Sequence, residues 1–221
     1  MPAVTIPHRL LRVALGSERG IAKVAADRSW HLTDLAGHDV VRPARLDGWG
    51  IERRGTRVRA IQADGYASPW VERGLMLVVD DSAGRVQWNA RAYRGNLAFH
   101  PSDSATVVVN VLDAESYLRG VVPLEMGTRP ATDVAAVEAQ AVVARSFAFE
   151  RMTSNAPRDY DLTASELDQV YGGINAETAK AMPPSRPRET SSSHIRAARS
   201  ALPITPCAAA VQRPRVKCGA R

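Results

Sequence analysis

The sequence predicts an α+β protein in which a β-rich N-terminal half packs around a central alanine-rich helix, followed by a disordered C-terminal tail. Short runs rich in β-branched residues recur between turn signals over residues 9–112. After residue 112 the apolar spacing changes to steps of three and four, which is the helical period. Strands followed by helices are typical of the α+β class. Hydrophobic residues make up 45% of the 221 residues, so a chain that is disordered throughout is excluded.

Four runs are predicted as strands because each is short and rich in β-branched or aliphatic residues. They are residues 12–15, 57–61, 75–79 and 106–112. Turn dipeptides separate them, namely Asp47-Gly48, Asp64-Gly65, Ala83-Gly84 and Arg94-Gly95. No fixed period recurs, which argues against a propeller or a solenoid.

A short helix is predicted for residues 114–119, because Asp113 can cap its N-terminus with its side chain. Gly120 and Pro123 are predicted to end it, since proline lacks the amide and restricts the residue before it. The residues that follow would then form a loop.

A longer helix is predicted for residues 133–152. Alanine is frequent there, which favours helix and lets neighbouring elements approach closely. We expect this helix to be deeply buried along one face, made by Val134, Val137, Ala141, Ala144, Ala148 and Met152.

Glu125 is the first candidate for chemistry. It lies in the predicted loop between Pro123 and Pro130, with apolar Leu124 and Met126 beside it. A carboxyl group kept partly out of water there could hold a proton and act as a general acid. The alternative is a solvated glutamate with no chemical role, which is the commoner case on spacing alone.

Gln140 and Arg145 interrupt the small, apolar surface of the longer helix. Arg145 lies seven residues after Glu138, two turns along the same side, which is too far for a direct pair at i,i+4 spacing. On pattern alone, a structural ion pair or a solvated stripe is the alternative to a binding role.

Three segments in order carry a resemblance to a known family: residues 117–126 (YLRGVVPLEM), 138–148 (EAQAVVARSFA) and 168–173 (DQVYGG). They resemble the motif series of the stage II sporulation protein D family, whose usual wording is close to YLxGVVPxEM, KAQAVAARTYA and QVYxG. The resemblance covers residues 90–180 well and the N-terminal strands loosely.

The resemblance implies a peptidoglycan lytic transglycosylase or a related amidase-enhancer module. Glu125 would be the catalytic acid and base, while Gln140, Arg145, Gln169 and Tyr171 would line the substrate groove through hydrogen bonds and a tyrosine ring stacked on a sugar. Glycosidases usually need two carboxylates. In a lytic transglycosylase the 6-hydroxyl of the muramic sugar attacks its own anomeric carbon, so one glutamate suffices.

The implied partners are peptidoglycan glycan strands and a cell-wall amidase, and the implied location is extracytoplasmic or in the cell wall. The chain shows no secretory signal at its N-terminus and no apolar stretch long enough for a transmembrane segment. Its two cysteines, Cys207 and Cys218, form no CxxC pair and have no histidine at ligand spacing, so we predict no metal and no cofactor.

Charge and composition change near residue 181. Residues 1–181 carry 21 basic against 22 acidic side chains, whereas residues 182–221 carry 8 against 1. We therefore divide the chain into a β-rich region (1–89), an incomplete motif-bearing domain (90–181) and a basic tail (182–221) expected to be disordered. Arginine makes up 26 of the 29 basic residues, which favours GC-rich coding and a reading-frame change as the tail's origin. Non-specific nucleic-acid binding is the alternative for this tail, and no specific nucleic acid is predicted.

Two classes of function remain open from the sequence. One is an enzyme that cleaves glycan strands between muramic acid and glucosamine to give 1,6-anhydro ends. The other is a non-catalytic peptidoglycan-binding or amidase-enhancer module, with an inactive truncated relic as its limiting case.

Overall fold

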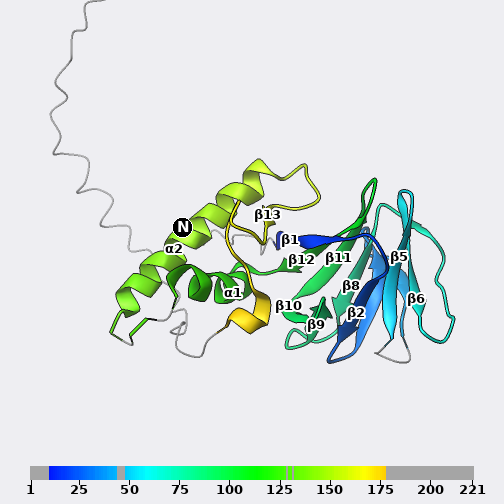
Figure 1. The fold of residues 1–221 in the computed structure, drawn as a ribbon, viewed down its shortest axis with the longest axis horizontal. Coiled ribbons are helices and arrows are strands. Elements are labelled where there is room, and N and C mark those ends of the chain that lie inside the picture. Colours follow the sequence, from blue (N-terminus) through cyan, green and yellow to red (C-terminus); the bar gives the residue numbers. More distant parts are fainter. Residues whose placement is uncertain (1–9, 44–47, 128, 131, 178–221) are drawn as a thin grey trace, which may run out of the picture. The chain divides into compact units, whose positions relative to one another are not determined.

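The computed structural model describes residues 10–43, 48–127, 129–130 and 132–177, so the predicted tail at 182–221 lies outside the described residues. Strands β1 to β12 come first along the chain, the two α-helices follow, and the short strand β13 comes after them (Figure 1). The strands are β1 (Leu11–Glu18), β2 (Ala22–Ala26), β3 (Trp30–Asp34), β4 (Asp39–Val41), β5 (Trp49–Arg54), β6 (Arg57–Gln62), β7 (Val71–Glu72), β8 (Leu75–Val79), β9 (Arg85–Trp88), β10 (Arg91–Arg94), β11 (Asn96–Pro101), β12 (Thr106–Leu112) and β13 (Leu162–Thr163). The helices are α1 (Ala114–Met126), α2 (Val134–Ser154) and the 3-10 turn η1 (Gly173–Ala176).

The predicted α+β class is confirmed by two sheets and two α-helices. One sheet has seven strands in the order β13-β1-β12-β11-β8-β3-β4, and the other has six in the order β10-β9-β2-β5-β6-β7. A single cluster of buried apolar side chains joins residues from both sheets and both helices. Leu11, Leu32, Ile51, Leu77 and Tyr117 are among its fully buried members.

Strand β1 holds the N-terminal strands and the later part of the chain in one sheet. It pairs antiparallel with β12, from Leu11 opposite Leu112 to Glu18 opposite Thr106, and parallel with β13. The residues on either side of position 90 therefore share one sheet. This places the strand bearing Arg12 directly beside the segment that follows α2.

The strong strand patterns predicted the structure well. Residues 75–79 and 106–112 coincide with β8 and β12, and residues 57–61 and 12–15 lie inside β6 and β1. The intervening strands were not predicted, because most are short and half-buried and lack a β-branched run. Their pairing with neighbours, such as β3 with β8 and β2 with β5, determines their conformation instead.

Helix α1 begins as predicted but ends later. The side chain of Asp113 accepts a hydrogen bond from the Ser116 amide at 2.9 Å, as expected for an N-cap. The predicted stop at Gly120 and Pro123 is wrong, since the helix continues to Met126. The two residues before Pro123, Val121 and Val122, are buried in the core, and this packing holds the backbone helical despite the missing proline amide. Glu125 consequently lies on the last turn of a helix and not in a loop.

Helix α2 is less buried than its alanine content predicted. Ala144, Ala148 and Met152 are buried as expected, but Val134 near its start is 44% exposed. Val137 and Ala141 in its first half are only partly buried against the core, and full burial begins at Ala144. The helix contacts α1, β1 and β13. The prediction of a deeply buried helix is therefore wrong for its first half.

The buried face of α2 leads to a stability prediction. Ala144 is 0% exposed, so Ala144→Leu must push extra methyl groups into a filled core and should lower the free energy of unfolding by about 1–3 kcal/mol. Ala139 is exposed on the same helix, and Ala139→Leu is the matched control, expected to change stability by less than about 0.5 kcal/mol. Urea unfolding measures both, and equal values would show that this face is not packed.

Candidate functional site

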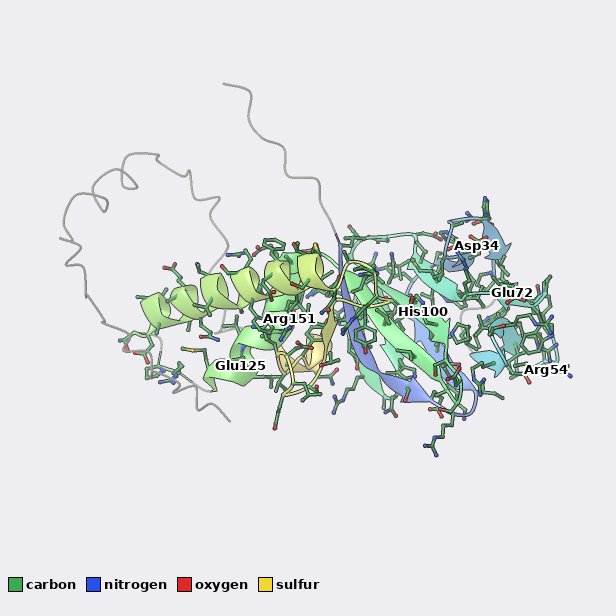
Figure 2. The ribbon with its side chains drawn as sticks, turned by 90° about the horizontal axis from the view of Figure 1, so that it is seen from above. Asp34, Arg54, Glu72, His100, Glu125 and Arg151 are labelled. Atoms are coloured by element: carbon green, nitrogen blue, oxygen red, sulfur yellow. The ribbon has the colours of Figure 1, made fainter. Side chains whose placement is uncertain are left out.

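Glu125 lies exposed on the last turn of α1, and one of its two carboxylate oxygens is held by the backbone. Its Oε1 accepts a hydrogen bond from the amide of Val170 at 3.2 Å. The structure thus brings together the first and third predicted motifs, which are 45 residues apart. Figure 2 labels Glu125 on α1 and Arg151 on α2.

The Val170 amide belongs to residues 161–177, which we call the clasp segment because it binds several elements in turn. At its start Asp161, 1% exposed, accepts hydrogen bonds from the backbone and the guanidinium of Arg12 on β1. Farther along, Asp168 accepts from Thr163 and pairs with Arg151 on α2 at 3.2 Å. At its end Glu177 accepts two hydrogen bonds, at 2.7 and 2.8 Å, from the guanidinium of Arg94, the last residue of β10.

Tyr171 anchors the middle of the clasp segment in the core. It is 3% exposed, and its hydroxyl donates to Asn110 Oδ1 at 2.8 Å on β12. Its ring centroid lies 5.2 Å from that of Tyr117 and 6.1 Å from that of Tyr93. The ring therefore has no free face for the sugar contact that the family resemblance implied.

Burial also shifts the pKa of Tyr171 and of its ring neighbour Tyr117. Desolvation raises the pKa of Tyr171 and of Tyr117 well above the usual range, with nearby acidic groups adding to the effect. Both hydroxyls donate hydrogen bonds within the core, Tyr171 to Asn110 and Tyr117 to Gln169.

Gln169 is also placed inside the protein. It is 8% exposed, and its Oε1 accepts a hydrogen bond from the Tyr117 hydroxyl at 3.1 Å. This contact links the third motif to the start of the first. Gln169 and Tyr171 flank Val170, so the two buried side chains fix the backbone that donates to Glu125.

The two predicted residues on α2 have other surroundings. Arg145 donates to Glu115 Oε1 on α1 at 3.0 and 2.7 Å, which is an ion pair between the helices and not a link to Glu138. Gln140 lies half-buried one turn before Ala144. Among the described residues, no hydrogen bond connects either side chain to Glu125.

Gly120 allows the clasp segment to approach α1 closely. A Cβ atom at this position would lie 2.5 Å from the Tyr171 ring and 3.1 Å from the carbonyl oxygen of Gly173. The amide of Gly172 donates to the Gly120 carbonyl at 3.1 Å, so the two backbones are in direct contact. Gly120 is therefore a packing residue and not a helix stop.

We expect Gly120→Ala to lower the free energy of unfolding by about 1–3 kcal/mol, because a ring and a carbonyl must move to admit the methyl group. Alanine's better helix propensity, worth about 1 kcal/mol, offsets only part of this. Gly20→Ala is the control, since a Cβ there meets only the tip of Glu18 at 3.7 Å. A Gly120→Ala protein as stable as the control would contradict the close approach.

Several residues that build the site were not identified from the sequence. Asn110 had a signal, because it is a polar residue within the apolar run of residues 106–112. Tyr117 stood inside the first motif but had no assigned role. The Val170 amide had no signal, since a backbone donor leaves no trace in residue type.

Over the described ranges, no group of three or more histidine, cysteine, aspartate and glutamate side chains could hold a metal ion. In the same part of the chain, no helix has both the length and the apolar character needed to cross a membrane.

Comparison with known proteins gives one family and one relative. Residues 102–202 match the family model described as Stage II sporulation protein (SpoIID), a range that includes residues 182–202 of the predicted tail. An uncharacterized protein of Brachyspira hyodysenteriae is 38% identical over 86 residues, which cover 38% of this chain and 23% of that protein. No solved structure matches the chain.

Proposed function

The chain carries a stage II sporulation protein D family domain over residues 102–202, and from this premise we propose that it is a peptidoglycan lytic transglycosylase with Glu125 as its catalytic residue. The family is consistent with a role at the cell wall. We further propose that the chain acts on the wall from an extracytoplasmic position, on glycan strands and alongside a cell-wall amidase.

The observation that carries this proposal is the position of Glu125. Its side chain is exposed, so a polymer can reach it, and yet Oε1 is fixed by the Val170 amide. Oε2 is then the oxygen left free to exchange a proton with the substrate in the proposed reaction. A carboxyl group that is both accessible and oriented is what general acid catalysis requires.

The proposed reaction needs no second carboxylate and no water. Glu125 gives its proton to the glycosidic oxygen while the bond from that oxygen to the anomeric carbon breaks, through a transition state with positive charge on the sugar. The 6-hydroxyl oxygen of the same muramic sugar then bonds to the anomeric carbon. Its proton passes to the Glu125 carboxylate, so the glutamate returns to its acid form and a 1,6-anhydro ring remains.

The residues around Glu125 support this role because they hold in place the Val170 amide, which donates a hydrogen bond to Glu125. Leu124, the chain neighbour of Glu125, and Val170, its backbone donor, are 44% and 36% exposed, so both reach the surface beside this residue. We propose that Gln169 and Tyr171 act through the backbone between them. For Gln140 and Arg145, substrate binding remains a prediction from the resemblance.

The test is digestion of purified glycan strands, followed by mass spectrometry of the products. Anhydro-muramic ends appear only if the bond is broken by the internal 6-hydroxyl, whereas hydrolysis gives reducing ends with an added water. Intact strands that are retained on immobilised protein would show binding alone and would contradict the enzymatic proposal.

A non-catalytic, amidase-enhancing module is the second candidate, and the surface of α2 favours it. Val142, Val143 and Phe149 are 49%, 60% and 42% exposed on this helix, more apolar surface than a helix facing only water usually shows. For this candidate, the chain would raise the rate of a wall amidase without producing anhydro ends. The two assays, run on the same glycan, separate the candidates.

A further inference from the structure

Three arginines gather at the tip of the β5–β6 hairpin, away from the site described above. Arg54 and Arg57 stand directly opposite each other across the hairpin, and Arg73 directly follows β7, the next strand in the sheet. All three are exposed. We call them the tip cluster, and Figure 2 shows Arg54 and Glu72 at this end of the β-strands, away from Glu125.

The tip cluster has a local excess of positive charge. Arg57 Nε lies 3.7 Å from Glu72 Oε1, and the Thr56 hydroxyl donates to Glu72 Oε2. Arg54, Arg57 and Glu72 stand opposite one another on β5, β6 and β7, so this row holds two positive charges and one carboxylate. Arg54 and Arg73 have no acidic partner within 4 Å among the described residues. This contrasts with Arg59, which pairs closely with Glu52 at 2.7 Å on the same face.

The arrangement costs stability in two independent ways. Like charges directly opposite on neighbouring strands repel each other, as Arg54 and Arg57 must. Arg73 has a φ of 69°, a left-handed conformation that residues other than glycine seldom adopt and that costs on the order of 1 kcal/mol.

We propose that the tip cluster binds the phosphate groups of an anionic polymer. Guanidinium groups present forked donors that match phosphate oxygens, and the opposed Arg54 and Arg57, together with Arg73 beside the end of β7, can engage successive charges of a polyanion. Bound phosphate would remove the repulsion between Arg54 and Arg57. This surface is separate from Glu125 and does not depend on whether the protein cleaves glycan.

The test uses the full chain, labelled with nitrogen-15 and titrated with a short inorganic polyphosphate. The amide signals of Gly55, Thr56, Arg73 and Gly74 should shift together, and the effect should weaken as salt is added. Because these amides lie at the tip cluster, their signals distinguish binding there from binding to residues 182–221, which carry their own basic side chains. Shifts confined to other parts of the chain would overturn the proposal.

Two variants test the arginines, with one control. Arg54→Gln should weaken the interaction about two- to fivefold, the range expected for one exposed ion pair. Arg73→Gly should weaken it similarly and also raise the melting temperature, because glycine adopts the left-handed conformation freely. Arg28→Gln removes an exposed arginine that pairs with Asp81 and should leave tip binding unchanged.

Two further probes decide the chemistry of the ligand. Poly-glutamate of similar charge should shift the tip signals much less than polyphosphate does, and an equal response would overturn the assignment to phosphate. Vesicles containing phosphatidylglycerol should likewise bind less well than the polymer. Binding to vesicles without binding to polyphosphate would identify a lipid surface and overturn the polymer proposal.

Discussion

Glu125→Gln is expected to lower the yield of anhydro-muramic ends by about 10²–10⁴-fold, the usual contribution of a general acid and base. The amide keeps the shape of the side chain and can still accept the hydrogen bond from Val170 through its carbonyl oxygen. It cannot donate and then recover a proton. Quantifying the anhydro products from a fixed amount of glycan gives the ratio.

The control for this variant is Glu138→Gln, which changes an exposed glutamate on α2 in the same way. It should leave both the yield and the stability unchanged. Circular dichroism and urea unfolding should show the Glu125→Gln protein folded as the parent is. Full activity in a folded Glu125→Gln protein would remove Glu125 from the mechanism.

Arg12→Met is expected to lower the free energy of unfolding by about 3–5 kcal/mol, because it leaves the Asp161 charge buried without its counter-ion. Asp161 is 1% exposed, and Arg12 also donates to the carbonyl oxygens of Asn155, Ala156 and Arg158. Methionine preserves the apolar stem but none of these bonds. Urea unfolding at neutral pH measures the difference.

Arg28→Met provides the comparison for an exposed pair. Arg28 and Asp81 are 52% and 45% exposed, so water already solvates both charges and their pairing contributes little. We expect a change of less than about 1 kcal/mol. If both variants were equally stable, burial of Asp161 would not be the origin of the effect.

Where the sequence pattern was strong, it predicted the fold. The run at 106–112 became β12 because β-branched residues fit a strand buried on both sides, and the Asp113 cap formed as expected. The predicted helix end at Gly120 and Pro123 was wrong, because burial of the neighbouring apolar residues outweighs the low helix propensity of glycine and proline. A helix that packs Val121 and Val122 against the core continues through a proline that would end an isolated helix.

The candidate site was predictable only in part, and for a physical reason. Its motifs identified Glu125, yet a motif does not tell whether a tyrosine stacks on a ligand or on other tyrosines. Tyr171 does the latter, between Tyr93 and Tyr117. The hydrogen bond that orients Glu125 comes from a backbone amide, and only the folded chain reveals where such a donor points.

The position of β1 has a consequence for the order in which the protein folds. This strand is made early, but Val13 pairs with Leu162, and Arg12 with Asp161, across 149 positions of the sequence. Closing so long a loop loses chain entropy before the pairing contributes any stability, which makes such contacts slow to form. Until β13 pairs with it, one edge of β1 has unpaired backbone groups, which can pair with strands of other chains. Val170 belongs to the same clasp segment, so its hydrogen bond to Glu125 forms only when β13 has paired with β1. Refolding should therefore restore the β1–β13 pairing and the site in one slow phase.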